Sequence, residues 1–278
     1  MGSGERISTP YFLVDEGLLR KNLKILKEVQ EQAGCRILLA QKAFSMFYAY
    51  PLIREYLAGS TASGLYEARL GHEEFGGETH VFSPAYRPDE FEELLGFADH
   101  FVFNSPDQVR RFGRRAKEAG KQVGLRINPE CSTQEGHAIY DPCAPGSRLG
   151  TTLDNFDEGV LPLLDGLHFH TLCEQGAEDL ETTVKAVEAK FGMYLMEMKW
   201  LNLGGGHHIT KDGYHVDLLI RLVRRLKETY HVEVYLEPGE AVVLNAGFLV
   251  SSVLDTMTNG MDIAILDTSA ACHMPDVL

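Results

Sequence analysis

The chain has 278 residues, of which 44% are hydrophobic and 24% are charged, and its formal net charge is −14. This composition is that of a folded globular protein, and it excludes collagen-like, disordered and disulfide-scaffold classes. The excess of acidic residues also argues against nucleic-acid binding, because such a surface repels phosphate backbones.

The N-terminus and the cysteines predict a cytoplasmic protein. The first ten residues, MGSGERISTP, contain no apolar core of the kind that a signal peptide needs. The longest uncharged stretch, residues 241–254, is shorter than the roughly 20 apolar residues of a membrane-spanning helix. Five cysteines, an odd number without a CxxC pair, indicate reduced thiols. We therefore expect neither a membrane nor a nucleic acid as a partner.

Short apolar segments alternate with amphipathic segments along most of the chain. A strand at Tyr11–Asp15 precedes a helix that has Leu19, Leu23 and Leu26 on one face. Eight further apolar runs predict strands at Arg36–Gln41, Ser60–Ala62, His80–Phe82, Phe101–Phe103, Gln122–Ile127, Gly166–Phe169, Lys199–Leu203 and Glu233–Leu236. Helical patterns separate most of these runs, for example at Asp107–Ala119, Glu178–Phe191 and Val216–Tyr230.

This alternation predicts an α/β fold with a parallel sheet and right-handed crossovers. Eight units in about 200 residues fit a closed (β/α)8, TIM-like barrel over residues 16–240, and a doubly wound open sheet is the alternative. After the last of these units, strands at 241–253 and 262–267 follow each other without a helix between them. Residues 7–15 and 241–278 are therefore expected to begin a C-terminal all-β domain, which looks incomplete.

Reactive side chains stand at the predicted C-terminal ends of the strands, where barrel enzymes place their chemistry. Lys42 follows the first barrel strand, where a partly buried amine would be a nucleophile towards carbonyls; taken alone, however, the position favours a lysine that snorkels to the rim. The run Gly204, Gly205 and Gly206 follows the seventh strand, either as a phosphate-binding turn or as a simple turn. Glu237 ends the eighth strand, where its carboxylate either faces a ligand or pairs with a cation.

Two histidines lie on the sixth predicted strand. Strand alternation places His168 and His170 on the same side of the strand, so both side chains can point into the barrel. For His168 we favour a hydrogen-bonded core position over a metal ligand. In the long loop that precedes this strand, no standard zinc-site spacing is found for Cys131, His137 and Cys143, so no metal is expected.

The lysine, the histidines, the glycine run and Glu237-Pro-Gly together resemble the fold-type III pyridoxal-phosphate enzymes, the group of alanine racemase and ornithine decarboxylase. Within this group the chain is most similar to the carboxynorspermidine (carboxyspermidine) decarboxylases. The similarity runs from about Ser8 to the last residue and rests on AQKAFSM, TASGLYEARLG, YDPCAPGSRLG, GLHFHTLCE, LNLGGGHHIT, EPGEA and DTSAACHMPDVL. It implies decarboxylation of carboxynorspermidine or carboxyspermidine to norspermidine or spermidine, a step of polyamine biosynthesis.

The resemblance implies a role for each matching position. Lys42 matches the catalytic lysine that holds pyridoxal 5'-phosphate as a Schiff base, and His170 matches the imidazole that stacks on the cofactor ring. The run Gly204–Gly206 matches the phosphate-binding turn. Glu237 matches the glutamate that keeps the pyridine nitrogen protonated, which makes the ring an electron sink.

Two acidic residues are implied as substrate contacts. Glu240 stands where ornithine decarboxylase-like enzymes have the arginine of EPGR, so a carboxylate for a substrate amine replaces a phosphate contact. Asp276, in HMPD, matches an acidic residue that binds the distal amine. The implied partner is a small cationic carboxylated triamine, held by charge-assisted hydrogen bonds. The implied assembly is a homodimer.

Other functions remain open from the sequence. An amino-acid racemase or a diaminopimelate-type decarboxylase would use the same cofactor, although EPGE in place of EPGR argues against them. A non-catalytic protein that binds pyridoxal phosphate is usually a barrel alone. The strands expected after Glu240 count against that alternative.

Overall fold

The computed structural model describes residues 7–134 and 141–277, apart from the side chain of Asp276, and the chain forms two compact units. The larger unit comprises residues 22–242, and the smaller unit combines residues 1–21 with residues 243–278. None of the helices among the described residues has the length and apolar character needed to cross a membrane.

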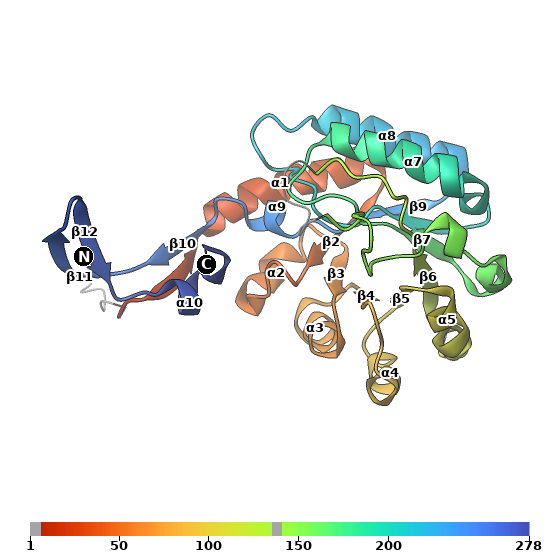
Figure 1. Ribbon diagram of the computed structural model, residues 1–278, viewed down its shortest axis with the longest axis horizontal. Helices are drawn as coiled ribbons and strands as arrows, with labels where there is room; N and C mark the ends of the chain where they lie inside the picture. Colours follow the sequence, from red (N-terminus) through yellow and green to blue (C-terminus); the bar gives the residue numbers. More distant parts are fainter. Residues whose placement is uncertain (1–6, 135–140, 278) are drawn as a thin grey trace. The chain divides into compact units, whose positions relative to one another are not determined.

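Eight parallel strands close into a barrel in the larger unit (Figure 1). Their order around the barrel follows the sequence, and the first strand pairs with the last where Arg36 lies opposite Tyr235. The strands are β2 (Arg36–Ala40), β3 (Gly59–Ala62), β4 (Glu78–Phe82), β5 (His100–Phe103), β6 (Gln122–Arg126), β7 (Gly166–His168), β8 (Trp200–Asn202) and β9 (Glu233–Leu236). The bounds agree to within two residues with the predicted runs, so the closed barrel is confirmed and the open sheet is wrong.

Helices follow the strands around the barrel, and α7 and α8 lie side by side (Figure 1). In α8 the side chains of Leu219, Val223 and Leu226 are buried on one face, and the helix ends where His231 adopts a left-handed φ of 56°. The α-helices of the larger unit are α1 (Glu16–Ala33, which begins in the smaller unit), α2 (Tyr50–Ile53), α3 (Leu65–Leu70), α4 (Pro88–Leu94), α5 (Pro106–Gln108), α6 (Arg114–Glu118), α7 (Ala177–Leu195), α8 (Val216–Tyr230) and α9 (Glu240–Val243). The larger unit also contains 3-10 helices at η1 (Phe47–Ala49), η5 (Leu153–Asn155) and η6 (Glu158–Leu163), and π-helical turns at η2 (Gly71–Phe75) and η3 (Val109–Gly113).

The indole of Trp200 explains two glycines in neighbouring strands. A Cβ at Gly166 would lie 2.0 Å from the Trp200 ring, and a Cβ at Gly124 would lie 2.2 Å from it. Trp200 belongs to a buried cluster with Leu38, Val102 and Tyr235. A barrel interior is a packed core rather than a channel, and here one large ring fills the space that two absent side chains leave.

His100 is buried beside this cluster and should make stability sensitive to acid. Burial, together with the charges of His80 and Arg36, lowers the pKa of His100 to about 2. Below about pH 6.5 the unfolded chain binds this proton and the folded chain does not. Stability should therefore fall as the pH drops from about 6.5 towards 2, by up to about 1.4 kcal/mol per pH unit.

Urea unfolding of His100→Phe between about pH 7 and pH 4 tests this expectation. The variant keeps a ring next to His80, whose centroid lies 3.9 Å from that of His100, and it should show a flatter dependence of the unfolding free energy on pH. Thr79→Val is the matched control, because Thr79 is also buried with an unpartnered polar atom but does not titrate. An unchanged slope in His100→Phe would contradict the expectation.

The smaller unit contains two antiparallel strand pairs. β1 (Tyr11–Val14) pairs with β10 (Gly247–Val250), and β11 (Val253–Thr258) pairs with β12 (Asp262–Leu266). After β12, the Asp267 carboxylate accepts hydrogen bonds from the Ser252 amide and the Ser251 hydroxyl, both at 2.9 Å. The unit ends with α10 (Ala270–His273) and η7 (Pro275–Val277).

The single strand predicted over residues 241–253 is wrong. Its first residues lie in α9, residues 247–250 form β10, and Val253 begins β11, with irregular segments between these elements. Ala241 and Val242 are buried in the larger unit, where the Val242 carbonyl accepts a hydrogen bond from Asn22 Nδ2 at 3.3 Å. A short apolar run looks the same in a buried helical turn as in a strand, so the periodicity could not separate the two.

Candidate active site

Lys42 lies in a tight turn directly after β2. The Ala43 N–H donates to the Ala40 carbonyl at 3.1 Å, and the buried Gln41 side chain accepts a hydrogen bond from the Tyr50 hydroxyl at 3.1 Å. These bonds fix the turn. Lys42 itself is exposed, which agrees with a lysine at the barrel rim and not with the alternative of a partly buried amine. The strand ends at Ala40, so Lys42 lies beyond the last residue of the sheet.

The turn after β9 packs directly against the Lys42 turn. The Ala40 N–H donates to the Pro238 carbonyl at 3.1 Å. A Cβ at Gly239 would lie only 2.5 Å from the Cβ of Ala43, so this approach requires glycine. The contact therefore brings the EPGE segment next to Lys42.

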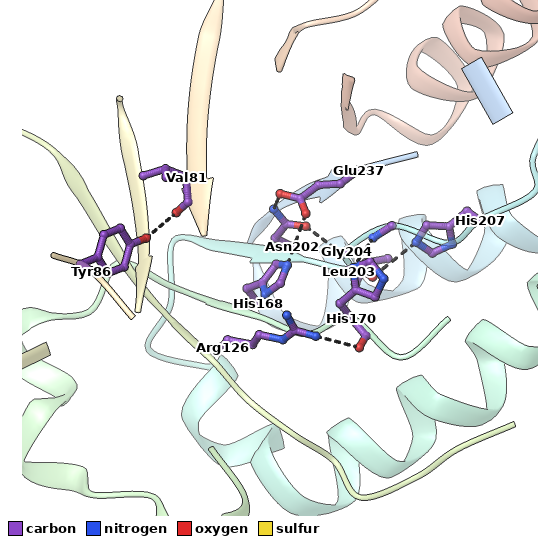
Figure 2. Close-up of polar contacts among 11 residues, drawn as sticks. Val81, Tyr86, Arg126, His168, His170, Asn202, Leu203, Gly204, His207 and Glu237 are labelled. Carbon is purple, nitrogen blue, oxygen red and sulfur yellow. Dashed lines mark hydrogen bonds and ion pairs between the residues drawn. The ribbon is translucent and has the colours of Figure 1, made fainter. Parts of the chain in front are cut away.

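Glu237 is a buried carboxylate at the centre of a hydrogen-bond network (Figure 2). Its Oε1 accepts from Asn202 Nδ2 at 2.8 Å, and its Oε2 lies 3.4 Å from His168 Nε2. Burial by itself raises the pKa of this carboxyl, but the hydrogen bonds and charge of its partners hold the pKa below its ordinary value. Glu237 is therefore ionised at neutral pH and places a negative charge inside the barrel.

His168, the last residue of β7, and His170, which follows this strand, are both neutral at neutral pH. Burial lowers the pKa of His168 against the opposing effect of Glu237, and burial together with the Arg126 charge lowers the pKa of His170. His170 Nδ1 accepts a hydrogen bond from the Gly205 amide at 3.2 Å, so its ring proton is on Nε2. His168 is buried and hydrogen-bonded, as its position on the strand predicted.

Arg126 and Asn202 belong to the same network, although the sequence predicted no role for either. Arg126, at the end of β6, is buried and donates from Nη2 to the His170 carbonyl at 3.3 Å. Burial lowers the pKa of Arg126 to about 10, which leaves a cation that Glu237 attracts. Asn202 donates to Glu237 and accepts from the Gly204 amide at 2.9 Å, so it joins the carboxylate to the glycine run. The sequence feature that could have identified both residues is a polar side chain at the end of an apolar barrel strand.

The run Gly204–Gly206 forms a cradle that side chains would fill. A Cβ at Gly205 would lie 2.5 Å from the Glu237 carbonyl oxygen, and a Cβ at Gly206 would lie 2.1 Å from the Leu172 oxygen. Gly204 and Gly206 also have φ values of 71° and 80°, which favour glycine. The amides of Gly204 and Gly205 donate within the protein, whereas the described hydrogen bonds include no acceptor for the Gly206 amide. The cradle fits an anion close to the backbone at Gly206, with two of its three amides already engaged.

Glu240 joins a second group of side chains after the last strands. Its Oε2 lies 3.2 Å from His208 Nε2, and the Glu174 carboxylate is within 4.8 Å of both residues' ligand atoms. Asp276 belongs to the smaller unit, and its side chain lies outside the described part of the chain, so its predicted role stays a prediction.

Among the described residues, two groups of side chains have ligand atoms close enough together to hold a metal ion. One is the group of Glu240, and the other combines Glu78 with the stacked rings of His80 and His100. His137, whose spacing from Cys131 and Cys143 fits no standard zinc site, lies outside the described residues.

The known proteins that resemble this chain in sequence are decarboxylases. No protein-family model matches the chain. The chain is 45% identical over 274 residues to the carboxynorspermidine/carboxyspermidine decarboxylase of Campylobacter jejuni, covering 99% of this chain and 71% of the relative. It is 40% identical over 274 residues to the carboxyaminopropylagmatine decarboxylase of Synechocystis sp., covering 98% of this chain and 70% of the relative.

The solved structures that resemble this chain are also decarboxylases. The crystal structure of carboxynorspermidine decarboxylase complexed with norspermidine from Campylobacter jejuni has a TM-score of 0.90 at 44% identity, covering 98% of this chain and 70% of that chain. A diaminopimelate decarboxylase from Helicobacter pylori has a TM-score of 0.80 at 18% identity, covering 95% of this chain and 71% of that chain. The second likeness shows the fold alone.

Proposed function

The chain belongs to the carboxynorspermidine/carboxyspermidine decarboxylase family, within the fold-type III decarboxylases, and from this premise we propose that it decarboxylates a carboxylated triamine with pyridoxal phosphate as its cofactor. The product would be norspermidine or spermidine, which makes the reaction a step of polyamine biosynthesis. The observation that carries the proposal is the ionised, buried Glu237 beside a glycine cradle and the Lys42 turn.

The residues of the network fit the cofactor. Lys42 would hold it through the side-chain amine, and His170 would lie against its ring. Glu237 would hold a proton on the pyridine nitrogen, because an ionised carboxylate pairs with a protonated ring and Asn202 keeps that carboxylate in place. When bound, pyridoxal phosphate supplies the electron sink for the electrons that remain on Cα after loss of CO₂.

The glycine cradle would hold the phosphate, and a single methyl group tests this. Gly205→Ala places a Cβ 2.5 Å from the Glu237 carbonyl and 3.2 Å from His170 Cε1, so the cradle must widen. Overpacking of this kind costs about 1–3 kcal/mol, and we expect at least roughly tenfold weaker binding of pyridoxal phosphate in a fluorescence titration. Gly64→Ala is the control, because Gly64 has an extended φ of 177° and no atom within 4 Å of the added methyl group. Equal affinity in the two variants would argue against the cradle.

Acidic groups near the site support a cationic substrate. Glu240 has an exposed carboxylate after β9, and we propose that it binds a substrate amine. The sequence resemblance alone supports Asp276 as a second acidic contact. We also propose a homodimer. Large apolar side chains of the smaller unit support it, because Phe12, Phe248 and Leu254 are 57%, 48% and 66% exposed.

A substrate comparison tests the proposed function. The protein, loaded with pyridoxal phosphate, is incubated with carboxynorspermidine, carboxyspermidine, carboxyaminopropylagmatine or diaminopimelate, and both CO₂ and the amine product are measured. We expect one molecule of CO₂ for each triamine formed from carboxynorspermidine or carboxyspermidine. Release from diaminopimelate alone, or racemisation of an amino acid without CO₂, would contradict the proposal. Release mainly from carboxyaminopropylagmatine would transfer the assignment to the activity named for the Synechocystis relative.

A further inference from the structure

Two carboxylates and one imidazole form a cluster of three acceptors after the last strands of the barrel. Glu174 follows β7, His208 follows the glycine cradle after β8, and Glu240 follows β9. One oxygen or nitrogen of each residue lies within 4.8 Å of the corresponding atoms of the other two. The barrel thus brings together three side chains that are separated in the sequence.

His208 points to a missing partner in this cluster. It is only 6% exposed, yet neither of its ring nitrogens has a hydrogen-bond partner among the described residues. Its Nε2 lies 3.2 Å from Glu240 Oε2 without the alignment of a hydrogen bond. A buried polar atom without a partner costs free energy. A donor group placed in the cluster would provide a partner for the acceptor nitrogen of the imidazole and for both carboxylates.

The charge of the two carboxylates is not balanced by a neighbouring lysine or arginine. Among the described residues, neither Glu174 nor Glu240 forms a salt bridge with a lysine or an arginine. The cluster also lies near the proposed cofactor lysine. Burial raises the pKa of the Cys173 thiol, Glu174 and Glu240 raise it further, and Lys42 lowers it, so all three charges act on one thiol. The site is therefore negative and close to the reaction.

We propose that Glu174, His208 and Glu240 bind the terminal ammonium group of the substrate, with Glu174 as a specificity-determining residue. This inference rests on the proposed function, which supplies a substrate that carries such a group. An ammonium has three N–H donors and no acceptor, one donor for each member of the cluster. Acceptors around one ammonium lie up to about 4.7 Å apart when each donor–acceptor distance is about 2.9 Å, which agrees with the spread of the cluster.

Glu174→Gln tests the site because it removes the charge and keeps the shape. Calorimetry on the full chain, loaded with pyridoxal phosphate, should show at least about tenfold weaker binding of norspermidine. Glu197→Gln is the matched control, since Glu197 is an exposed carboxylate beyond α7, outside the cluster, and it should bind norspermidine as the wild type does. With carboxynorspermidine as substrate, Glu174→Gln should raise KM by a similar factor and leave kcat within about twofold. With N-propyl-2,4-diaminobutyrate, which lacks the terminal amine, KM should not depend on Glu174.

The outcomes separate the site from the reaction. Equal norspermidine affinity in Glu174→Gln and the wild type would overturn the proposal, and so would loss of wild-type binding in EDTA, which would assign the cluster to a divalent cation. Glu174-dependent binding of norspermidine without CO₂ release from carboxynorspermidine would support the ammonium site and contradict the proposed function. CO₂ release with no effect of Glu174 on KM or binding would support the function and overturn the site.

Discussion

Replacing Lys42 by alanine should lower the rate of decarboxylation by roughly 10³-fold or more, because the variant loses the amine that would hold the cofactor and exchange with the substrate. The turn itself should survive, since its hydrogen bonds run through the backbone and the Gln41 side chain. The measurement is the initial rate of CO₂ release from carboxynorspermidine with saturating pyridoxal phosphate.

Two further variants separate the amine from its charge. Lys42→Arg keeps a cation, but a guanidinium is not a nucleophile at neutral pH, so this variant should be as inactive as Lys42→Ala. Lys185→Ala removes an exposed lysine on α7 that pairs with Glu181, and it should retain full activity. Activity above about a tenth of the wild type in Lys42→Ala would contradict the assigned role.

Glu237→Gln should lower kcat by roughly 10²- to 10³-fold, the range found when a preorganised electrostatic contact is removed. The amide cannot hold a proton on the pyridine nitrogen as an anion does. The packing should change little, because Asn202 Nδ2 can still donate to the new amide oxygen. His168 Nδ1 has no partner, so its ring can move its proton to Nδ1 and accept from the new amide nitrogen.

The control for Glu237→Gln lies at the start of β9, the strand that Glu237 directly follows. Glu233→Gln, at the start of β9, changes a carboxylate that is paired with Lys227 and should leave kcat unchanged. Steady-state kinetics of both variants are compared after each has been shown to bind pyridoxal phosphate. A kcat for Glu237→Gln within about threefold of the wild type would show that the buried charge does not assist the reaction.

The barrel could be predicted from the sequence because its strands are short apolar runs between strongly periodic helices. Val216–Tyr230 shows this well, since the predicted helix and α8 have the same bounds. The prediction of a single strand over residues 241–253 was wrong, because this apolar run has no clear period. Its first apolar residues are buried in a helical turn, whereas Phe248 and Val253 are exposed in two different strands, and tertiary contacts decide this rather than periodicity.

The site could be predicted only in part, because its contacts join positions far apart in the chain. Asn202 and Glu237 are 35 residues apart, and His168 and Glu237 are 69 residues apart. The order of strands in a barrel makes such residues neighbours, but only the register decides which side chains meet. The sequence favoured a rim position for Lys42 but left a partly buried amine open, because one residue at the end of a strand separates a buried position from the rim.

Reduction with borohydride followed by peptide mass spectrometry tests the central claim most directly. The protein is incubated with pyridoxal phosphate, reduced and digested, and Lys42→Ala is treated in parallel. We expect a pyridoxyl adduct on the peptide that contains Lys42 and none at that position in the variant. An adduct confined to other lysines, or no adduct on a folded wild-type protein with the cofactor supplied, would contradict this expectation.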